Sequence, residues 1–294
     1  MKLSHKTISL PSEGFFYDNE LSCGKIQIYP FTAHEEDILS ENSSNDYELI
    51  DQILKSMIVN DVNIDDLLAV DVDAILLAQR IISYGTSYDV KITCPHCSDE
   101  NDYSLDLKKI TSVDKIYNFS NIIQFENYSI EVVPETWEMR KKCKSKSDTL
   151  KNIIKSVTKH NSIDDFVDNR FLSRDAREFR KKYKSIMPEL NFSLFTCSCK
   201  ACDKPMPINL KINRSFFGLT PNYKITLHKE IFNLAYFSEG AFNQDIVYRL
   251  PVYLRRFYLN ELRTTKEKEK EQSQEGFSPN EKSEGVPRGP FGKK

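Results

Sequence analysis

Two cysteine motifs decide how this chain folds: Cys94-Pro95-His96-Cys97 and, much later, Cys197-Ser198-Cys199-Lys200-Ala201-Cys202. Each contains two cysteines separated by two residues, a spacing that lets both sulfurs of a tight turn reach one tetrahedral metal ion. Strand-like apolar runs flank the motifs, at residues 90–93, 103–107, 192–196 and 207–210. The pattern predicts a zinc ribbon, in which two hairpin knuckles bind one structural Zn²⁺ and a long insertion separates them.

The predicted metal ligands are the four cysteines of the two CxxC pairs: Cys94, Cys97, Cys199 and Cys202. Cys197 could replace Cys199, because it lies only two residues away, and His96 could replace a thiolate. Iron is an alternative to zinc. A redox-active pair usually lies where a strand meets a helix, and neither motif does. Reduced cysteines that only pack in the core are the alternative interpretation.

Composition limits the class of protein. The chain has 294 residues and 39% hydrophobic content, enough for one large domain or two modest ones. Its net charge of -2 predicts no general attraction to nucleic acid or to anionic membranes. The seven cysteines, the absence of a signal-peptide pattern and the lack of a long apolar run indicate a cytosolic protein without a membrane span.

The remaining patterns predict an α+β fold. Strands are expected at residues 6–10, 24–30 and 128–133. Thr32 and Glu35 have the spacing of a capping box at the start of a helix. Apolar residues at helical spacing predict helices over residues 47–59, 72–82, 150–157 and 174–186, the last capped by Ser173, and a short helix at Leu67-Leu68. The fold is therefore small antiparallel β elements with a zinc ribbon, helical insertions and a C-terminal helical segment.

Three regions follow from composition. Residues 1–218 form the β-hairpin and helical domain with the ribbon, residues 219–264 form an apolar helical segment, and residues 265–294 form a disordered charged tail. The helical segment is interpreted as a docking unit for a hydrophobic partner helix, or as a small subdomain folded against the ribbon. Its predicted partner-binding residues are apolar: Ile231, Phe232, Tyr236, Leu254, Phe257 and Tyr258.

The stretch from Arg80 to Cys97, with Pro30 to Leu39 and Asp65 to Leu68 upstream, resembles the baseplate and tail assembly proteins of T-even-like contractile-tailed phages. The resemblance covers roughly residues 6–218, and a run similar to Leu250–Tyr258 also recurs in such proteins. It implies an assembly factor, or chaperone, that binds baseplate hub, tail or tape-measure protein segments in the host cell cytoplasm. A virion baseplate subunit is the alternative within this family.

No catalytic constellation is present, because the five histidines lack a paired nucleophile and no Gly-rich phosphate loop occurs. We therefore predict a non-enzymatic protein with no catalytic residues. A nucleic-acid-binding or regulatory ribbon is a further alternative, although carboxylates offset the lysines near the knuckles. The basic run from Lys141 to Lys146 lacks interleaved aromatic residues and is interpreted as a solvated loop or helix end.

Overall fold

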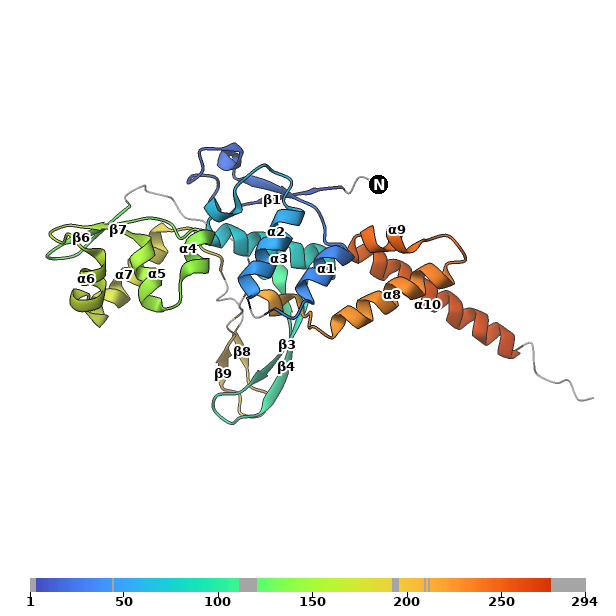
Figure 1. Cartoon of the computed structure of the whole chain (residues 1–294). Helices are drawn as coiled ribbons and strands as arrows, with labels where there is room; N and C mark the ends of the chain where they lie inside the picture. The colour runs from blue at the N-terminus through green and yellow to red at the C-terminus, as the bar shows by residue number, and fades with distance from the viewer. Residues whose placement is uncertain are drawn as a thin grey trace, which may run out of the picture.

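The computed structural model describes residues 4–43, 45–110, 121–191, 196–208, 210 and 212–275. A central body carries three extensions: an insertion, a ribbon arm that contains both cysteine motifs, and a C-terminal helical unit (Figure 1). Its helices occur with small antiparallel sheets of two or three strands, which confirms the predicted α+β class. Among the described residues, every helix is too short or too polar to span a bilayer.

The body is a two-stranded antiparallel sheet packed with three helices around the largest core cluster. The predicted capping box is present, with the Glu35 carboxylate accepting the Thr32 N–H. The expected short helix does not include Leu67 and Leu68: a 3-10 turn at Ile64–Asp66, capped by the Asn63 side chain, lies directly before them. The regular elements are β1 (Lys6–Ser9), β2 (Lys25–Ile28), α1 (Ala33–Leu39), α2 (Asp46–Met57) and α3 (Ala69–Tyr84), with a 3-10 turn at Glu20–Cys23.

A buried hydrogen-bond group fixes the N-terminal turn on α3. The Asp71 carboxylate accepts the Ser12 N–H at 3.0 Å and the Tyr17 hydroxyl at 2.6 Å. Tyr17 in turn accepts the Leu68 N–H at 2.8 Å. Burial raises the pKa of Asp71 above its ordinary value, although these donors oppose that shift. The group therefore joins two segments that are distant in sequence, residues 12–17 and residues 68–71.

The insertion, residues 121–191, is a three-stranded antiparallel sheet in the order β5-β6-β7, covered by helices around its own core. The prediction of a helix over residues 150–157 is half wrong: α5 ends at Ile153, and Ile154–Val157 pairs with β6 as a strand. Ser173 is the first residue of α7 rather than its cap. The bounds are β5 (Ile122–Gln124), β6 (Ser129–Val132), α4 (Trp137–Lys142), α5 (Lys146–Ile153), β7 (Ile154–Val157), α6 (Ile163–Asp165), a π turn at Phe166–Arg170, and α7 (Ser173–Ile186).

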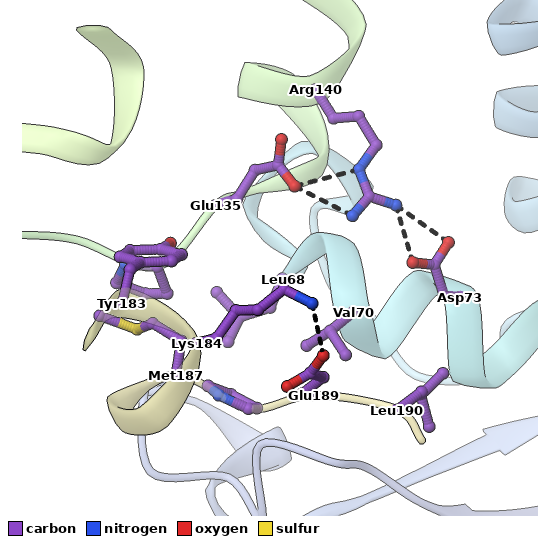
Figure 2. Close-up of a pocket in the computed structure, with 12 residues that line it drawn as sticks. Leu68, Val70, Asp73, Glu135, Arg140, Tyr183, Lys184, Met187, Glu189 and Leu190 are labelled. Carbon is purple, nitrogen blue, oxygen red and sulfur yellow. Dashed lines mark hydrogen bonds and ion pairs between the residues drawn. The ribbon is translucent and has the colours of Figure 1, made fainter. Parts of the chain in front are cut away.

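Ion pairs attach the insertion to the body. Arg140 binds Asp73 and Glu135, each at 2.9 Å, beside a cavity of about 250 Å³ between the two units (Figure 2). Lys141 binds Asp51 at 2.7 Å and Asp65 at 2.5 Å. Lys141 lies at the end of helix α4, as one of the two expectations for the basic run had it, but its side chain is not solvated, because carboxylates of the folded body lie beside it.

The C-terminal unit packs against helices α1 and α3 of the body. Arg255 of α10 forms an ion pair with Glu36 of α1, and both side chains are fully buried. The Val252 N–H donates to the Phe31 carbonyl at 2.8 Å, and the Tyr248 hydroxyl donates to Asp37 at 2.7 Å. The unit consists of α8 (Tyr223–Phe237), α9 (Gln244–Arg249) and α10 (Val252–Glu275).

Helix α10 also enters the predicted charged tail. It continues through Glu275, so residues 265–275 are helical, and the rest of the predicted tail lies outside the described residues. Lys and Glu three residues apart support this part of the helix, as between Lys266 and Glu269 at 2.8 Å. The predicted domain boundaries themselves stay predictions.

We expect Arg255→Leu to lower the free energy of unfolding by about 3–5 kcal/mol, because it leaves the Glu36 carboxylate buried without its cation. The matched control is Arg249→Leu, which removes an exposed pair with Asp245 and should cost at most about 1 kcal/mol. Denaturant unfolding at neutral pH measures both values. Equal losses in the two variants would contradict a special role for the buried pair.

Candidate metal centre

The ribbon arm consists of two antiparallel hairpins that project from the body (Figure 1). In the first, β3 (Ser87–Thr93) pairs with β4 (Glu100–Asp106), so that Thr93 lies opposite Glu100 next to the first knuckle. In the second, β8 (Thr196–Ser198) pairs with β9 (Pro205–Pro207). The predicted strand residues 192–195 lie outside the described residues. Strand β9 begins at Pro205, before the expected strand at residues 207–210. Side chains from both hairpins pack with Phe216 at the base of the arm, next to the 3-10 turns Leu107–Lys109 and Arg214–Phe217.

The first knuckle is a tight turn closed by backbone hydrogen bonds. The Cys94 N–H donates to the Asp99 carbonyl at 2.8 Å, and the Ser98 N–H donates to the Cys94 carbonyl at 2.9 Å. Ser98 has a positive φ of 62°, which reverses the chain after Cys97. The His96 N–H points at the Cys94 sulfur at 3.4 Å, while its side chain is exposed. This geometry turns both sulfurs inward and leaves the imidazole outside.

The second knuckle repeats this geometry position by position. The Cys199 N–H donates to the Lys204 carbonyl at 2.9 Å, and the Asp203 N–H donates to the Cys199 carbonyl at 2.9 Å. Asp203 has a positive φ of 57° at the place equivalent to Ser98. Cys199 is therefore the counterpart of Cys94. Cys197 precedes the turn on β8 and packs with the cluster at the base of the arm.

The four predicted ligand sulfurs meet between the knuckles. All lie within 4.8 Å of one another, with 3.8 Å between Cys94 and Cys202 and 3.6 Å between Cys97 and Cys199. A tetrahedral ion with metal–sulfur bonds of about 2.3 Å would hold its sulfurs about 3.8 Å apart, whereas a disulfide would place them about 2.05 Å apart. The cysteines thus fit a four-thiolate metal site, a donor set taken by both zinc and iron.

Local donors favour a thiolate at the most buried ligand. Burial raises the pKa of the Cys199 thiol, but the N–H groups of Ala201 and Cys202 and the neighbouring thiols outweigh that effect and lower the pKa to about 6. Because the thiolate is the metal-binding form of cysteine, the fold prepares this sulfur for a cation.

Asn101 and Tyr103 join the two knuckles, and sequence reasoning missed them. The buried Asn101 amide donates to the Cys199 sulfur at 3.5 Å and accepts the Lys200 N–H at 2.8 Å. The Tyr103 hydroxyl donates to the Ser198 carbonyl at 2.6 Å. The available signal was alternation along β4, which puts Asn101, Tyr103 and Leu105 on its inward face.

The predicted partner-binding residues divide into two groups. Ile231 is only 4% exposed and belongs to the core of the C-terminal unit. Tyr258 packs against this core, and Leu254 is half-buried. Phe232 and Tyr236 of α8 and Phe257 of α10 are more than half exposed. The second group can touch a partner without repacking the unit, whereas Ile231 is covered by its neighbours.

We expect Cys94→Ser and Cys202→Ser to lose the bound metal together with solubility, because the ion contributes folding free energy directly. The matched control is Cys197→Ser, which should keep one metal ion per chain. Elemental analysis of the purified variants measures the metal content. Retention in Cys199→Ser together with loss in Cys197→Ser would overturn this ligand set.

Asn101→Leu should keep the four ligands but weaken metal affinity about 10–100-fold, because it removes the hydrogen bond to a ligand sulfur. Ser104→Ala, on the exposed face of the same strand, is the control and should bind metal like the wild type. Competition with a chromogenic chelator gives the affinities. Equal affinities for both variants would assign Asn101 a packing role only.

Comparison with known families supports a phage origin. A family model described as T4 bacteriophage base plate protein matches residues 13–218. The match includes the body from residue 13 onward, the insertion and both knuckles, and it ends before the C-terminal unit begins. Comparisons with curated proteins and with solved structures gave no significant match. Because the matched residues make up more than half of the sequence, the chain belongs to the T4 bacteriophage base plate protein family.

Proposed function

We propose that this baseplate-family protein is a non-enzymatic assembly factor, which holds hub, tail or tape-measure protein segments on its C-terminal helical unit in the host cytoplasm. The ribbon acts as a zinc-stabilised structural element. Four thiolates fill a tetrahedral coordination sphere, so the site offers no open position for a substrate or a reactive water.

The observation that carries the docking role is that α8 is apolar on two opposite faces. Leu227, Ile231 and Leu234 are buried in the unit's core. The opposite face carries three large exposed residues: Ile225 at 63%, Phe232 at 51% and Tyr236 at 67%. Their spacing puts them in one stripe about 16 Å long.

Such a stripe differs from the scattered apolar residues of an ordinary surface. The rings of Phe232 and Tyr236 stack at 5.4 Å, so they form one continuous apolar patch. Contiguous patches of this kind are typical of surfaces that bind other proteins. Lys224, His228 and Lys229 flank the stripe, and these groups suit an amphipathic helix with carboxylates beside its apolar face.

A permanent baseplate subunit is the second candidate, and the family match favours it directly. The two candidates share the docking surface and differ in whether the chain stays in the mature particle. Mass spectrometry of purified virions separates them. If the protein is present in purified virions in stoichiometric amounts, that result would support the baseplate subunit. If it is absent from them, that result would support the assembly factor.

We expect Phe232→Glu/Tyr236→Glu to reduce co-purification with the phage's hub, tail or tape-measure proteins at least tenfold in co-expressing cells, because charge on the stripe opposes apolar burial. The matched control is Leu172→Glu, which changes an equally exposed residue of the insertion. Circular dichroism checks the fold of both variants. Unchanged binding by the double variant would refute this docking surface.

A further inference from the structure

Charge is distributed unevenly along this nearly neutral chain. Residues 1–110 contain 20 Asp and Glu against 8 Lys and Arg, a net charge of -12. Residues 121–191, the insertion, contain 11 Asp and Glu against 15 Lys and Arg, a net charge of +4. The ion pairs of Arg140 and Lys141 neutralise part of this difference at the seam between the units. The remaining positive charge lies elsewhere on the insertion.

Helix α7 carries much of that charge on one outward face, which we call the basic stripe: Arg174, Arg177, Lys181 and Lys184. These residues follow one another at three- and four-residue spacing, opposite the buried Phe179. The adjacent Arg180 is also exposed. Among the described residues, Arg177, Arg180 and Lys181 have no ion pair within 4.0 Å. The stripe spans about 15 Å.

Like charges at three- and four-residue spacing destabilise a helix by about 0.2–0.5 kcal/mol per pair. Other exposed helices of this chain avoid that cost: Glu138 and Lys142 pair on α4, and Lys266 and Glu269 pair on α10. In the basic stripe, Arg174 lies 3.5 Å from Asp175 and Lys184 lies 2.9 Å from Glu189, whereas Arg177 and Lys181 keep their like charges side by side. An opposite charge supplied from outside the insertion would explain why.

A complementary surface lies on the outer face of the β3–β4 hairpin, which we call the acidic arm face: Asp89, Glu100, Asp102 and Asp106. All four are exposed. Strand alternation puts the three β4 carboxylates on one side over about 20 Å, a length close to that of the basic stripe. Lys91 is the one cation on this face among the described strand residues, and it lies 3.4 Å from Glu100.

We propose that copies of this chain associate head to tail, with the basic stripe of one copy on the acidic arm face of the next. The two surfaces belong to different extensions of the molecule (Figure 1). The residues of both are exposed within one copy. The contact is heterologous, so repetition would build a ring or a filament. Arginines suit it, because a guanidinium binds a carboxylate through two hydrogen bonds.

The charge of the whole chain favours carboxylates over a nucleic-acid backbone as the ligand of the stripe. The chain has a net charge of -2, which gives it no general attraction to a polyanion. Glu178 is exposed along one side of the stripe, whereas Arg180 is exposed along the other. A duplex that covered the stripe would also meet Glu178, whereas a strand that presents a single row of carboxylates needs to contact only the basic residues. Such a small polar contact is weak and salt-sensitive.

The test uses sedimentation velocity of the metal-loaded full chain at about 100 µM, where a contact with micromolar Kd is mostly formed. We expect the wild type to associate in low salt and to become monomeric at about 1 M salt, where the Debye length is about 3 Å. Arg177→Glu/Lys181→Glu and Asp89→Lys/Asp102→Lys should each weaken association at least tenfold. An equimolar mixture of the two double variants should associate again, because each supplies the charge that the other now needs.

The matched control is Lys266→Glu/Lys270→Glu, which reverses two charges in the alternating run of α10 and should associate like the wild type. Metal content and circular dichroism establish that every variant is folded. A wild type that stays monomeric in low salt would overturn the proposal, as would association that survives both reversals. Failure of the mixture to associate would also overturn it, and so would binding of duplex DNA through Arg177 and Lys181 by a monomer.

Discussion

The four-sulfur cluster constrains the rest of the structure, because it connects two parts of the chain that are far apart in sequence. Cys97 and Cys199 are 102 residues apart, and the whole insertion lies between them. The length-dependent part of the entropy cost of closing such a loop is about 4 kcal/mol. A structural zinc site contributes about 10–16 kcal/mol when it forms. A bound ion would therefore be strong enough to hold both ends of the insertion at one place, and Asn101 shows how the protein supports that junction from inside the ribbon.

Ion pairs attach the insertion and the C-terminal unit to the body. The acidic body binds the insertion through Arg140 and Lys141, and it binds the C-terminal unit through the buried pair of Glu36 and Arg255. Glu36 also accepts hydrogen bonds from the hydroxyls of Tyr84 and Tyr223, so one carboxylate joins α1, α3, α8 and α10. Polar contacts of this kind require particular geometry, unlike apolar burial, and they define how each unit is oriented on the body.

The molecule carries its candidate contact surfaces on different extensions. The region that matches the baseplate family contains the metal centre, most of the body and the basic stripe. The apolar face of α8 lies beyond the matched residues. An apolar surface and a charged surface on different extensions can bind different partners at the same time, which suits a component of a multi-protein baseplate.

The sequence by itself determined the features that depend on a few neighbouring residues: the spacing of each CxxC pair, the Thr32–Glu35 capping box and the buried face of α2. Local hydrogen bonds and helical periodicity are encoded within about five residues, so they can be recognised in one sequence. Only the tertiary structure decided which of Cys197 and Cys199 joins the cluster, why Ile154–Val157 is a strand, and which face of α8 is exposed. Each of these depends on a partner far away in sequence: the opposite knuckle, strand β6, or the core completed by α9 and α10. Local propensity carries no information about such partners, and the free energy of long-range pairing outweighs it.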